Sequence, residues 1–388
     1  TASGMLDIYT EAYLLYPRNN EIRVGLNDSA RGLLDWSVEQ HQKGRFTTAI
    51  NRYNTIIDTP GIYNSITSHA KTYRDLAESG KKITIIKDVV NGAVQNYSYY
   101  QMQADIKKLE QMYPNLITTK IIGESVDGRN LYAIKLGNGN KEIFFNGSHH
   151  AREHMTTNVL MKMLDEYARS YVGQTYYNGY NTREILNDVS IWFVPMVNPD
   201  GVMLVQEGAS SANNPDKVIA INNGSSNFKS WKANVRGVDL NRQYAYRWDD
   251  VAFDPGKPSY ANYKGTAPLS EPETKAVYDF TNQHDFKAAV AYHSSGEVIY
   301  SIYGYDSHTQ RVAEGVGEIT GYTPIDLRGS DSVAGYTDWF VSSNHNAGIT
   351  VEISPSVYEQ PVPLSNWYSI WNENKTVGLY TANYVRNN

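Results

Sequence analysis

The first part of the chain, up to about residue 92, has apolar residues at helical spacing. In residues 33–57, LLDWSVEQHQ and FTTAINRYNTII carry apolar side chains three and four positions apart, and KGR separates the two runs. Because positions at this spacing share one helix face, the pattern predicts two helices joined by a tight turn. EAYLLYPRNNEIRVGL and ITSHAKTYRDLAESGKK predict further helices. We therefore expect an all-helical domain over residues 1–92.

The pattern changes in the second part, where short apolar or alternating runs are separated by helical segments. The predicted strands are ITTKIIGES, NLYAIKLG, EIFFNG, SIWFVPMV, AAVAYHSS, EVIYSIYG and GITVEIS, and ADIKKLEQMY and NVLMKMLDEYA are predicted helices. SEPET is expected to begin a helix, with Ser270 as its N-cap and Glu273 completing a capping box. Strands that alternate with helices indicate an α/β domain over residues 93–388, whose loops carry the site.

The role of the N-terminal helices is open at this point. Their hairpins resemble tetratricopeptide repeats, which are stacked pairs of helices. That resemblance makes a module that binds the cell wall or a protein partner one interpretation, on an equal footing with a plain helical appendage. A plain helical appendage and an inhibitory pro-segment are the alternatives, and neither needs such a partner.

Composition narrows the class of protein. Of the 388 residues, 41% are hydrophobic and 20% charged, and no run approaches the roughly 18 uninterrupted apolar residues of a membrane span. The formal net charge of -6, without long runs of Lys or Arg, argues against a nucleic-acid partner. Cysteine is absent, which excludes cysteine-based metal sites and favours a secreted or cell-wall associated bacterial protein. The first residues, TASGMLDIYT, lack the basic start and apolar core of a signal peptide.

Three histidines lie in SHHAREH, directly after the predicted strand EIFFNG. Within this segment His150 and Glu153 form H-x-x-E, whose spacing allows both side chains to reach one ion. A catalytic zinc site takes three protein ligands, commonly two histidines and a carboxylate. His293, at the end of the apolar run AAVAYHSS, is the candidate for the third ligand. Each signal alone is weak, because H-x-x-E occurs by chance and a single histidine after a strand is usually structural.

Glu352 is the candidate general base. It lies in TVEIS between Val351 and Ile353, and a carboxylate buried in such a strand is costly unless it is paired or takes up a proton. Such a glutamate is either ion-paired or poised for acid–base chemistry. Donors for an oxyanion or a substrate carboxylate cluster in WKANVRGVDLNRQYAYRW, namely Lys232, Arg236, Asn241 and Arg242.

These residues resemble the zinc carboxypeptidase family over residues 96–380. The resemblance rests on seven segments in the family order: HARE at 150–153, VNPDG at 197–201, GVDLNR at 237–242, SEPET at 270–274, AYHSS at 291–295, GYTDW at 335–339 and TVEIS at 350–354. It implies a mixed central sheet flanked by helices, and one Zn²⁺ ion bound by His150, Glu153 and His293. It also implies Glu352 as general base and substrate contacts from Arg152, Asn241 and Arg242.

Within the family, WKANVRGVDLNRQY, HSSGEVIY and GYTDWF are most similar to bacterial γ-D-glutamyl-diamino acid endopeptidases, which cleave cell-wall peptides. Two positions depart from the digestive carboxypeptidases. Lys232 stands where those enzymes have an oxyanion-binding arginine, so Lys232 or Arg236 is expected to take that role. Ser330 stands where they have a substrate-capping tyrosine, which Tyr322 or Tyr336 would have to replace.

Thr337 matches the floor of the family's specificity pocket, and its small neutral side chain supports neither a basic-specific nor a strongly acid-specific pocket. The resemblance thus implies a zinc metallopeptidase that hydrolyses the γ-D-glutamyl-diamino acid bond of a peptide or muropeptide. Glu352 would pass a proton from the attacking water to the leaving amine. Two other functions stay open: a secreted carboxypeptidase that removes C-terminal residues, and a non-catalytic peptidoglycan-binding protein. Neither the diamino acid nor the oligomeric state follows from the sequence.

Overall fold

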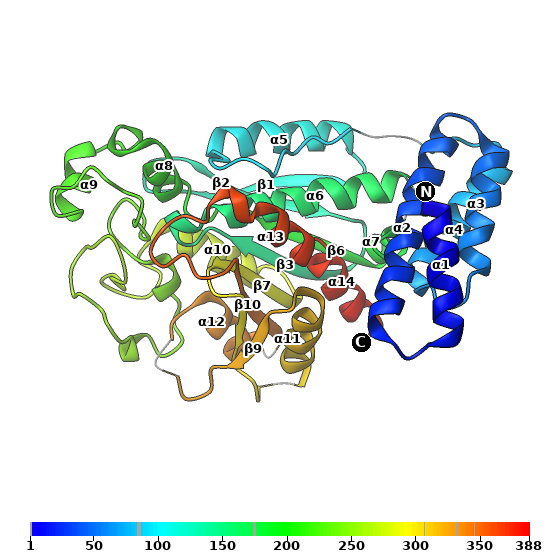
Figure 1. The fold of residues 1–388 in the computed structure, drawn as a ribbon. Coiled ribbons are helices and arrows are strands. Elements are labelled where there is room, and N and C mark those ends of the chain that lie inside the picture. The colour runs from blue at the N-terminus through cyan, green and yellow to red at the C-terminus, as the bar shows by residue number, and fades with distance from the viewer. Residues whose placement is uncertain (1, 84–86, 174–175, 306, 331–332, 345) are drawn as a thin grey trace. The chain divides into compact units, whose positions relative to one another are not determined.

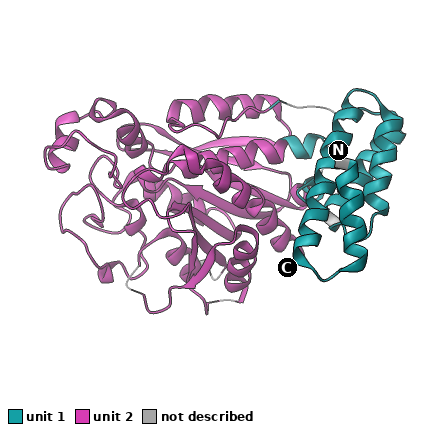
Figure 2. Cartoon of the chain, in the orientation of Figure 1, with its two compact units in different colours: residues 1–87, 169–184 teal, residues 88–168, 185–388 magenta. Residues whose placement is uncertain are grey.

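The computed structural model describes residues 2–83, 87–173, 176–305, 307–330, 333–344 and 346–388 (Figure 1). The chain divides into two compact units (Figure 2). Unit 1 comprises residues 1–87 and 169–184, and unit 2 comprises residues 88–168 and 185–388. In the part of the chain that the structure describes, no helix combines the length and the apolar content that crossing a bilayer requires.

Unit 1 is built mainly from helices, as the N-terminal pattern predicts. They are α1 (Ala2–Leu15), α2 (Asn20–Gln42), α3 (Phe46–Asp58) and α4 (Asn64–Glu78), and a short hairpin pairs β4 (Tyr176–Tyr177) with β5 (Tyr180–Asn181). The side chain of Asn19 caps α2 by accepting a hydrogen bond from the backbone N–H of Ile22 at 3.1 Å. The turn predicted at KGR joins α2 to α3, where Gly44 has a φ of 77° that L-residues rarely adopt.

The apolar faces of these helices form a core of their own. In α3 the buried residues Ala49, Tyr53 and Ile56 lie four and three positions apart, and they pack with Leu33 of α2 and Ile66 of α4. Burial of this shared face, rather than helix propensity, stabilises short helices such as these. The tetratricopeptide-like arrangement of the helices, and the boundaries 1–92 and 93–388, stay predictions.

Unit 2 contains a mixed eight-stranded sheet, which confirms the predicted fold class. Its strands are β1 (Ile117–Glu124), β2 (Asn130–Leu136), β3 (Lys141–Gly147), β6 (Val189–Val194), β7 (Phe286–Ser294), β8 (Val298–Ser301), β9 (Thr323–Asp326) and β10 (Ala347–Ile353). The spatial order is β1-β2-β6-β3-β7-β10-β8-β9. The central strands β6, β3, β7 and β10 run parallel, whereas β1 and β2, β2 and β6, and β10 and β8 pair antiparallel.

Helices cover both faces of this sheet (Figure 1). The helices that follow α4 along the chain are α5 (Tyr99–Met112), α6 (Met155–Gly173), α7 (Thr182–Asp188), α8 (Pro199–Glu207), α9 (Pro215–Ile221), α10 (Pro272–Asn282), α11 (Ser307–Thr320), α12 (Tyr336–Asn344), α13 (Trp367–Asn374) and α14 (Val377–Asn387). Phe144 of β3 packs in one buried core with Phe280 of α10 and Phe340 of α12. The next residue along β3, Phe145, faces the opposite side with Phe193, because side chains alternate along a strand.

The start of α10 differs from the prediction. Its N-cap is Glu271 and its first helical residue is Pro272, so the predicted capping box of Ser270 and Glu273 is wrong. Tertiary partners take both side chains instead. The hydroxyl of Ser270 donates to Gln243 at 3.1 Å, and a side-chain oxygen of Glu273 accepts a hydrogen bond from the backbone N–H of Val126 at 3.1 Å.

The sheet brings three predicted site segments to one edge. Strands β3, β7 and β10 are parallel neighbours, so their carboxyl ends lie together. Glu352 of β10 is in register with His293 of β7, and Gly147, the last residue of β3, is in register with Tyr292. His150 follows Gly147 by three positions. In α/β sheets this edge is where active sites form.

Candidate active site and metal centre

His150, Glu153 and His293 converge at this edge, and all three are buried. Nδ1 of His150 lies 2.8 Å from one carboxylate oxygen of Glu153, and Nδ1 of His293 lies 2.9 Å from the other. The two Nδ1 atoms are 3.1 Å apart. His150 precedes a 3₁₀ turn at Ala151–Glu153, which turns the Glu153 side chain back towards the imidazole. One ligand atom from each residue lies within 4.8 Å of the others.

The donor set suits one zinc ion. Two imidazoles and one carboxylate form the protein part of a catalytic zinc site and leave a position for water or substrate. The second nitrogen of His150, Nε2, lies 3.1 Å from Oδ1 of Asp239. A proton held on Nε2 by that carboxylate leaves the lone pair of Nδ1 directed at the other two ligands, as metal binding requires.

Asp239 is a site residue that the sequence reasoning missed, although it lies in the quoted motif GVDLNR. Its side chain is fully buried and accepts a hydrogen bond from the backbone N–H of Asn241 at 3.0 Å. The Lys232 ammonium lies 2.9 Å from its second oxygen. Burial by itself would raise the pKa of Asp239, but Lys232 and His150 hold it well below its usual range. Asp239 therefore stays ionised and orients both a metal ligand and a predicted catalytic lysine.

The two glutamates of the site have opposite pKa shifts. Burial would raise the pKa of Glu153, yet the imidazoles of His150 and His293 bring it below its usual range, so this ligand is a carboxylate. The pKa of Glu352 is raised well above its usual value, because the site desolvates its carboxyl and because Glu153 repels a second charge. Lys232 partly offsets this rise. Paired carboxyls driven apart in this way are typical of acid–base catalysis.

These groups open into a cavity of about 380 Å³. The predicted site residues that line it are Arg152, Lys232, Asn241, Arg242, Thr337 and Glu352, with the three metal-ligand candidates. Arg236 is not among the lining residues, and its guanidinium lies 3.6 Å from the carboxylate of Glu271. Of the two cations proposed for the oxyanion, only Lys232 thus reaches the cavity.

Comparison with known families shows to which family this chain belongs. The family model described as zinc carboxypeptidase matches residues 102–374. This range contains all seven segments that carry the resemblance and none of the helices α1 to α4. The chain belongs to the zinc carboxypeptidase family. It is therefore a zinc metallopeptidase, and His150, Glu153 and His293 form a group able to hold the ion.

Relatives of this zinc carboxypeptidase include two bacterial proteins. The chain is 39% identical over 301 residues to γ-D-glutamyl-L-diamino acid endopeptidase 1 of Lysinibacillus sphaericus, covering 76% of this chain and 73% of the relative. It is 34% identical over 284 residues to the uncharacterized protein YqgT of Bacillus subtilis, covering 71% and 74%. Among solved structures, bovine thrombin-activatable fibrinolysis inhibitor in complex with tick carboxypeptidase inhibitor matches with a TM-score of 0.61 at 21% identity. That match covers 76% of this chain and 99% of the other, and it supports the fold.

The predicted substrate contacts have clear positions in this zinc carboxypeptidase. Arg152 donates to the backbone oxygen of Ser230 at 2.9 Å, and the hydroxyl of Thr337 lies 2.7 Å from that of Thr350. Arg242 donates to the backbone oxygen of Asn241 at 2.8 Å. These internal bonds hold the three side chains in place while they face the cavity.

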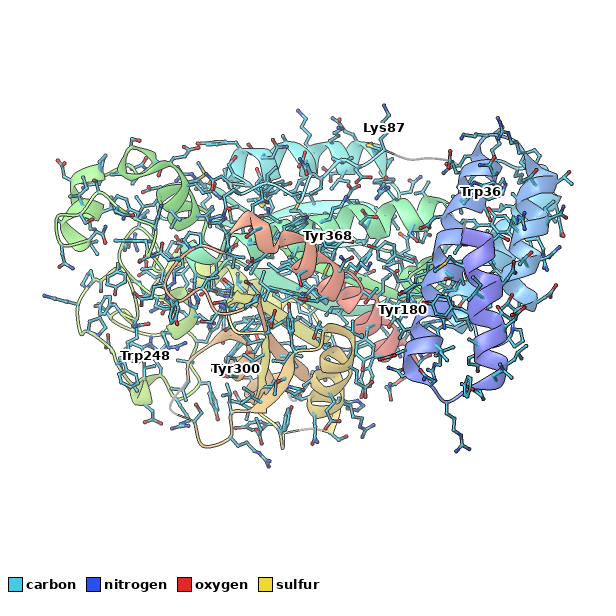
Figure 3. The ribbon with its side chains drawn as sticks, viewed as in Figure 1. Trp36, Lys87, Tyr180, Trp248, Tyr300 and Tyr368 are labelled. Atoms are coloured by element: carbon cyan, nitrogen blue, oxygen red, sulfur yellow. The ribbon has the colours of Figure 1, made fainter. Side chains whose placement is uncertain are left out.

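The tyrosines at the cavity are not the ones that were considered from the sequence. Tyr336 is fully buried in the core, with its hydroxyl 3.2 Å from that of Thr281, and Tyr322 donates to Glu373 at 2.8 Å. Neither lines the cavity. Tyr300 of β8, labelled in Figure 3, and Tyr358 do line it, and Tyr358 is 89% exposed. Tyr300 lies on a strand that the sequence predicts, but its place at the cavity follows from the pairing of β8 with β10, which no local pattern predicts.

The other two histidines of SHHAREH have packing roles. His149 is fully buried, and its Nε2 lies 3.0 Å from the hydroxyl of Tyr244. Its ring stacks on that of His293 with centroids 5.7 Å apart, so it supports a metal ligand from behind. His154 is buried as well, and burial lowers its pKa to about 4. Only one histidine of the cluster is thus a ligand candidate.

Proposed function

We propose that this zinc peptidase hydrolyses the bond between the γ-carboxyl of D-glutamate and a diamino acid in cell-wall stem peptides. The observation that carries hydrolysis is that the metal ligands and Glu352 line one cavity at the carboxyl ends of β3, β7 and β10. The choice of bond is supported by the 39% identity to an endopeptidase named for it. The wall-peptide motifs WKANVRGVDLNRQY and HSSGEVIY point the same way.

Zinc bound by His150, Glu153 and His293 would supply a Lewis acid and lower the pKa of water at the site towards about 7. Glu352 takes one proton from the water that attacks the scissile carbonyl. The same carboxyl then returns this proton to the nitrogen of the leaving diamino acid. Because its pKa is raised, Glu352 accepts a proton more readily than a solvent-exposed glutamate would.

The other residues of the cavity bind the substrate and stabilise the oxyanion. Lys232, held by Asp239 at 2.9 Å, donates a hydrogen bond to the oxyanion that develops at the scissile carbon. Asn241 and Arg242 bind a carboxylate on the leaving side, since Arg242 presents a planar fork that matches a carboxylate. Arg152 lines the substrate cleft, and Thr337 forms the floor of the specificity pocket.

The substrate places this activity outside the cytoplasm, so we include secretion or wall association in the proposal. The chain has no cysteine that an oxidising compartment could convert to a disulfide. Residues 93–388 form the catalytic domain in this proposal, and residues 1–92 form a helical module that attaches to the wall or to a partner.

The proposal is tested by replacing Glu352→Gln and measuring both zinc content and cleavage of purified muropeptides. We expect one bound zinc and a loss of kcat of at least about 100-fold, the usual contribution of a general base. Glu124→Gln, an exposed glutamate of β1 outside the cavity, is the matched control and should retain full activity. Full peptidase activity of the zinc-loaded Glu352→Gln protein would rule the proposed role out.

A further inference from the structure

Unit 1 contains a cavity of about 400 Å³ that shares no lining residue with the catalytic cavity. It lies between α2, α4 and the β4–β5 hairpin, all of which belong to the same unit (Figure 2). Figure 3 labels Trp36 on α2 and Tyr180 on the hairpin, which mark these elements. The lining residues that matter here are Arg31, Asp35, His69, Tyr73, Tyr176 and Tyr177. A cavity of this size accommodates a small organic molecule or the end of a larger one.

One wall of the cavity is aromatic and firmly held. The rings of His69 and Tyr73 stack with centroids 6.2 Å apart and an interplanar angle of 13°. The ring of Tyr176 meets His69 edge-on at 5.7 Å, and His69 is also hydrogen-bonded to the backbone oxygen of Tyr176. Burial lowers the pKa of His69, so this imidazole is neutral at physiological pH and does not repel a cation. The wall offers flat faces for an alkyl chain or an ammonium group.

The opposite charges of Arg31 and Asp35 lie at the same cavity, one helical turn apart on α2. They do not pair with each other. Arg31 pairs instead with Asp28 at 3.0 Å through an exposed contact. Between Arg31 and Asp35 the arginine is N-terminal to the acid, which is the weaker orientation on a helix. The carboxylate of Asp35 makes no hydrogen bond or close ion pair with another described residue. Both side chains are exposed, so a ligand in the cavity can reach Asp35 directly and can reach Arg31 by sharing it with Asp28.

Asp35 also lies close to the aromatic wall. Burial raises the pKa of Tyr73 to about 12, and the neighbouring charge of Asp35 contributes to the rise. Partial desolvation raises the pKa of Asp35 as well, with Arg31 acting in the opposite direction. A carboxylate beside tyrosine rings, without a partner of its own, is a place where an organic ammonium is stabilised by both charge and ring face.

We propose that this cavity binds the zwitterionic end of a diamino acid, with the ammonium on Asp35, the carboxylate on Arg31 and the alkyl chain along the aromatic wall. The free end of diaminopimelate carries both groups on one carbon, whereas the side chain of lysine ends in an ammonium alone. A lysine side chain would engage Asp35 through its ammonium but would offer Arg31 no carboxylate, so Arg31 would keep its pair with Asp28. The biological role, which rests on the proposed function, is to hold stem peptides whose diamino acid is not cross-linked.

The test is calorimetric titration of the full-length, zinc-loaded protein with meso-diaminopimelate and, separately, with Nα-acetyl-L-lysine amide. We expect the first probe to bind more tightly. Asp35→Asn should weaken its binding at least about tenfold, whereas Glu39→Gln should leave it unchanged. Glu39 is the matched control because it lies on α2, is exposed and pairs with Lys43 outside the cavity. Arg31→Gln should abolish the preference for diaminopimelate over the lysine derivative.

Because diaminopimelate can also enter the catalytic cavity, the same titration is made with Arg242→Gln. Binding that is lost with Arg242→Gln and unaffected by Asp35→Asn would overturn the inference, as would equal affinity for the two probes. Thermal unfolding of each variant shows that it is folded. A wild-type protein that shows the expected binding pattern but cleaves no muropeptide would support this site and contradict the proposed function, so the two failures are separable.

Discussion

Replacing Asp239→Asn should weaken zinc binding while leaving the fold intact. Oδ1 of Asp239 is 3.1 Å from Nε2 of His150, and its other oxygen is 2.9 Å from the Lys232 ammonium. The amide keeps the shape but removes the charge that holds the proton on Nε2 and balances Lys232. Loss of such a partner of a metal-bound histidine costs about 10- to 100-fold in metal affinity. That is about 1.4 to 2.8 kcal/mol.

The assay is competition for zinc with a chelator of known affinity, followed by thermal unfolding with and without metal. We expect the stabilisation by zinc to shrink in the variant, because a ligand that binds more weakly stabilises less at the same concentration. Asp250→Asn, an exposed aspartate that pairs with Arg247, is the matched control. Unchanged zinc affinity in a folded Asp239→Asn protein would refute the assignment, even if the metal-free protein were less stable.

Three further predictions concern substrate binding, pH and packing. Arg242→Gln should raise KM about tenfold or more for a substrate with a free carboxylate on the leaving side, and steady-state kinetics should show no such effect once that carboxylate is amidated. Burial raises the pKa of Glu273 from 4.5 to about 8, so between pH 4.5 and 8 this side chain is protonated in the folded protein and deprotonated in the unfolded chain. The free energy of unfolding therefore falls by up to a few kcal/mol as the pH rises from 4.5 to 8. Denaturant unfolding at pH 5 and 8 should show a smaller fall for Glu273→Gln, and an equal fall would contradict the reasoning. Phe144→Ala should cost about 3 to 5 kcal/mol, because its buried ring stacks on Phe286 at 5.0 Å, whereas Phe253→Ala, at a 91% exposed site, should cost little.

The local pattern of apolar residues predicts two kinds of element: helices that bury one face, and strands that are buried on both faces. The strands β3, β7 and β10 follow from apolar runs, and α3 follows from the spacing of Ala49, Tyr53 and Ile56. The start of α5 was missed, since ADIKKLEQMY predicts a helix from residue 104 whereas α5 begins at Tyr99. The hydroxyl of Ser98 caps α5 by accepting a hydrogen bond from the backbone N–H of Gln101 at 3.2 Å. Serine is a common N-cap residue, so the local sequence does contain a signal for this helix start.

Some residues of the candidate site follow from local sequence, and others depend on tertiary structure. H-x-x-E is a local spacing, so it makes His150 and Glu153 ligand candidates without any knowledge of the tertiary structure. Asp239 acts on His150 only because its loop folds back across a separation of 89 residues, so its role depends on tertiary structure. Ser270 and Glu273 show the reverse case, in which a sound local capping signal loses to tertiary partners.

The most direct test of the central claim is the mass of the products from one substrate, L-Ala-γ-D-Glu-meso-diaminopimelyl-D-Ala, incubated with the zinc-loaded protein. Cleavage at the γ-D-glutamyl bond gives L-Ala-D-Glu and diaminopimelyl-D-Ala, which mass spectrometry separates from every other pair of fragments. We predict these two products, formed at least about 100-fold more slowly by the Glu352→Gln protein. Release of D-Ala alone, leaving the tripeptide, would identify a carboxypeptidase and contradict the account.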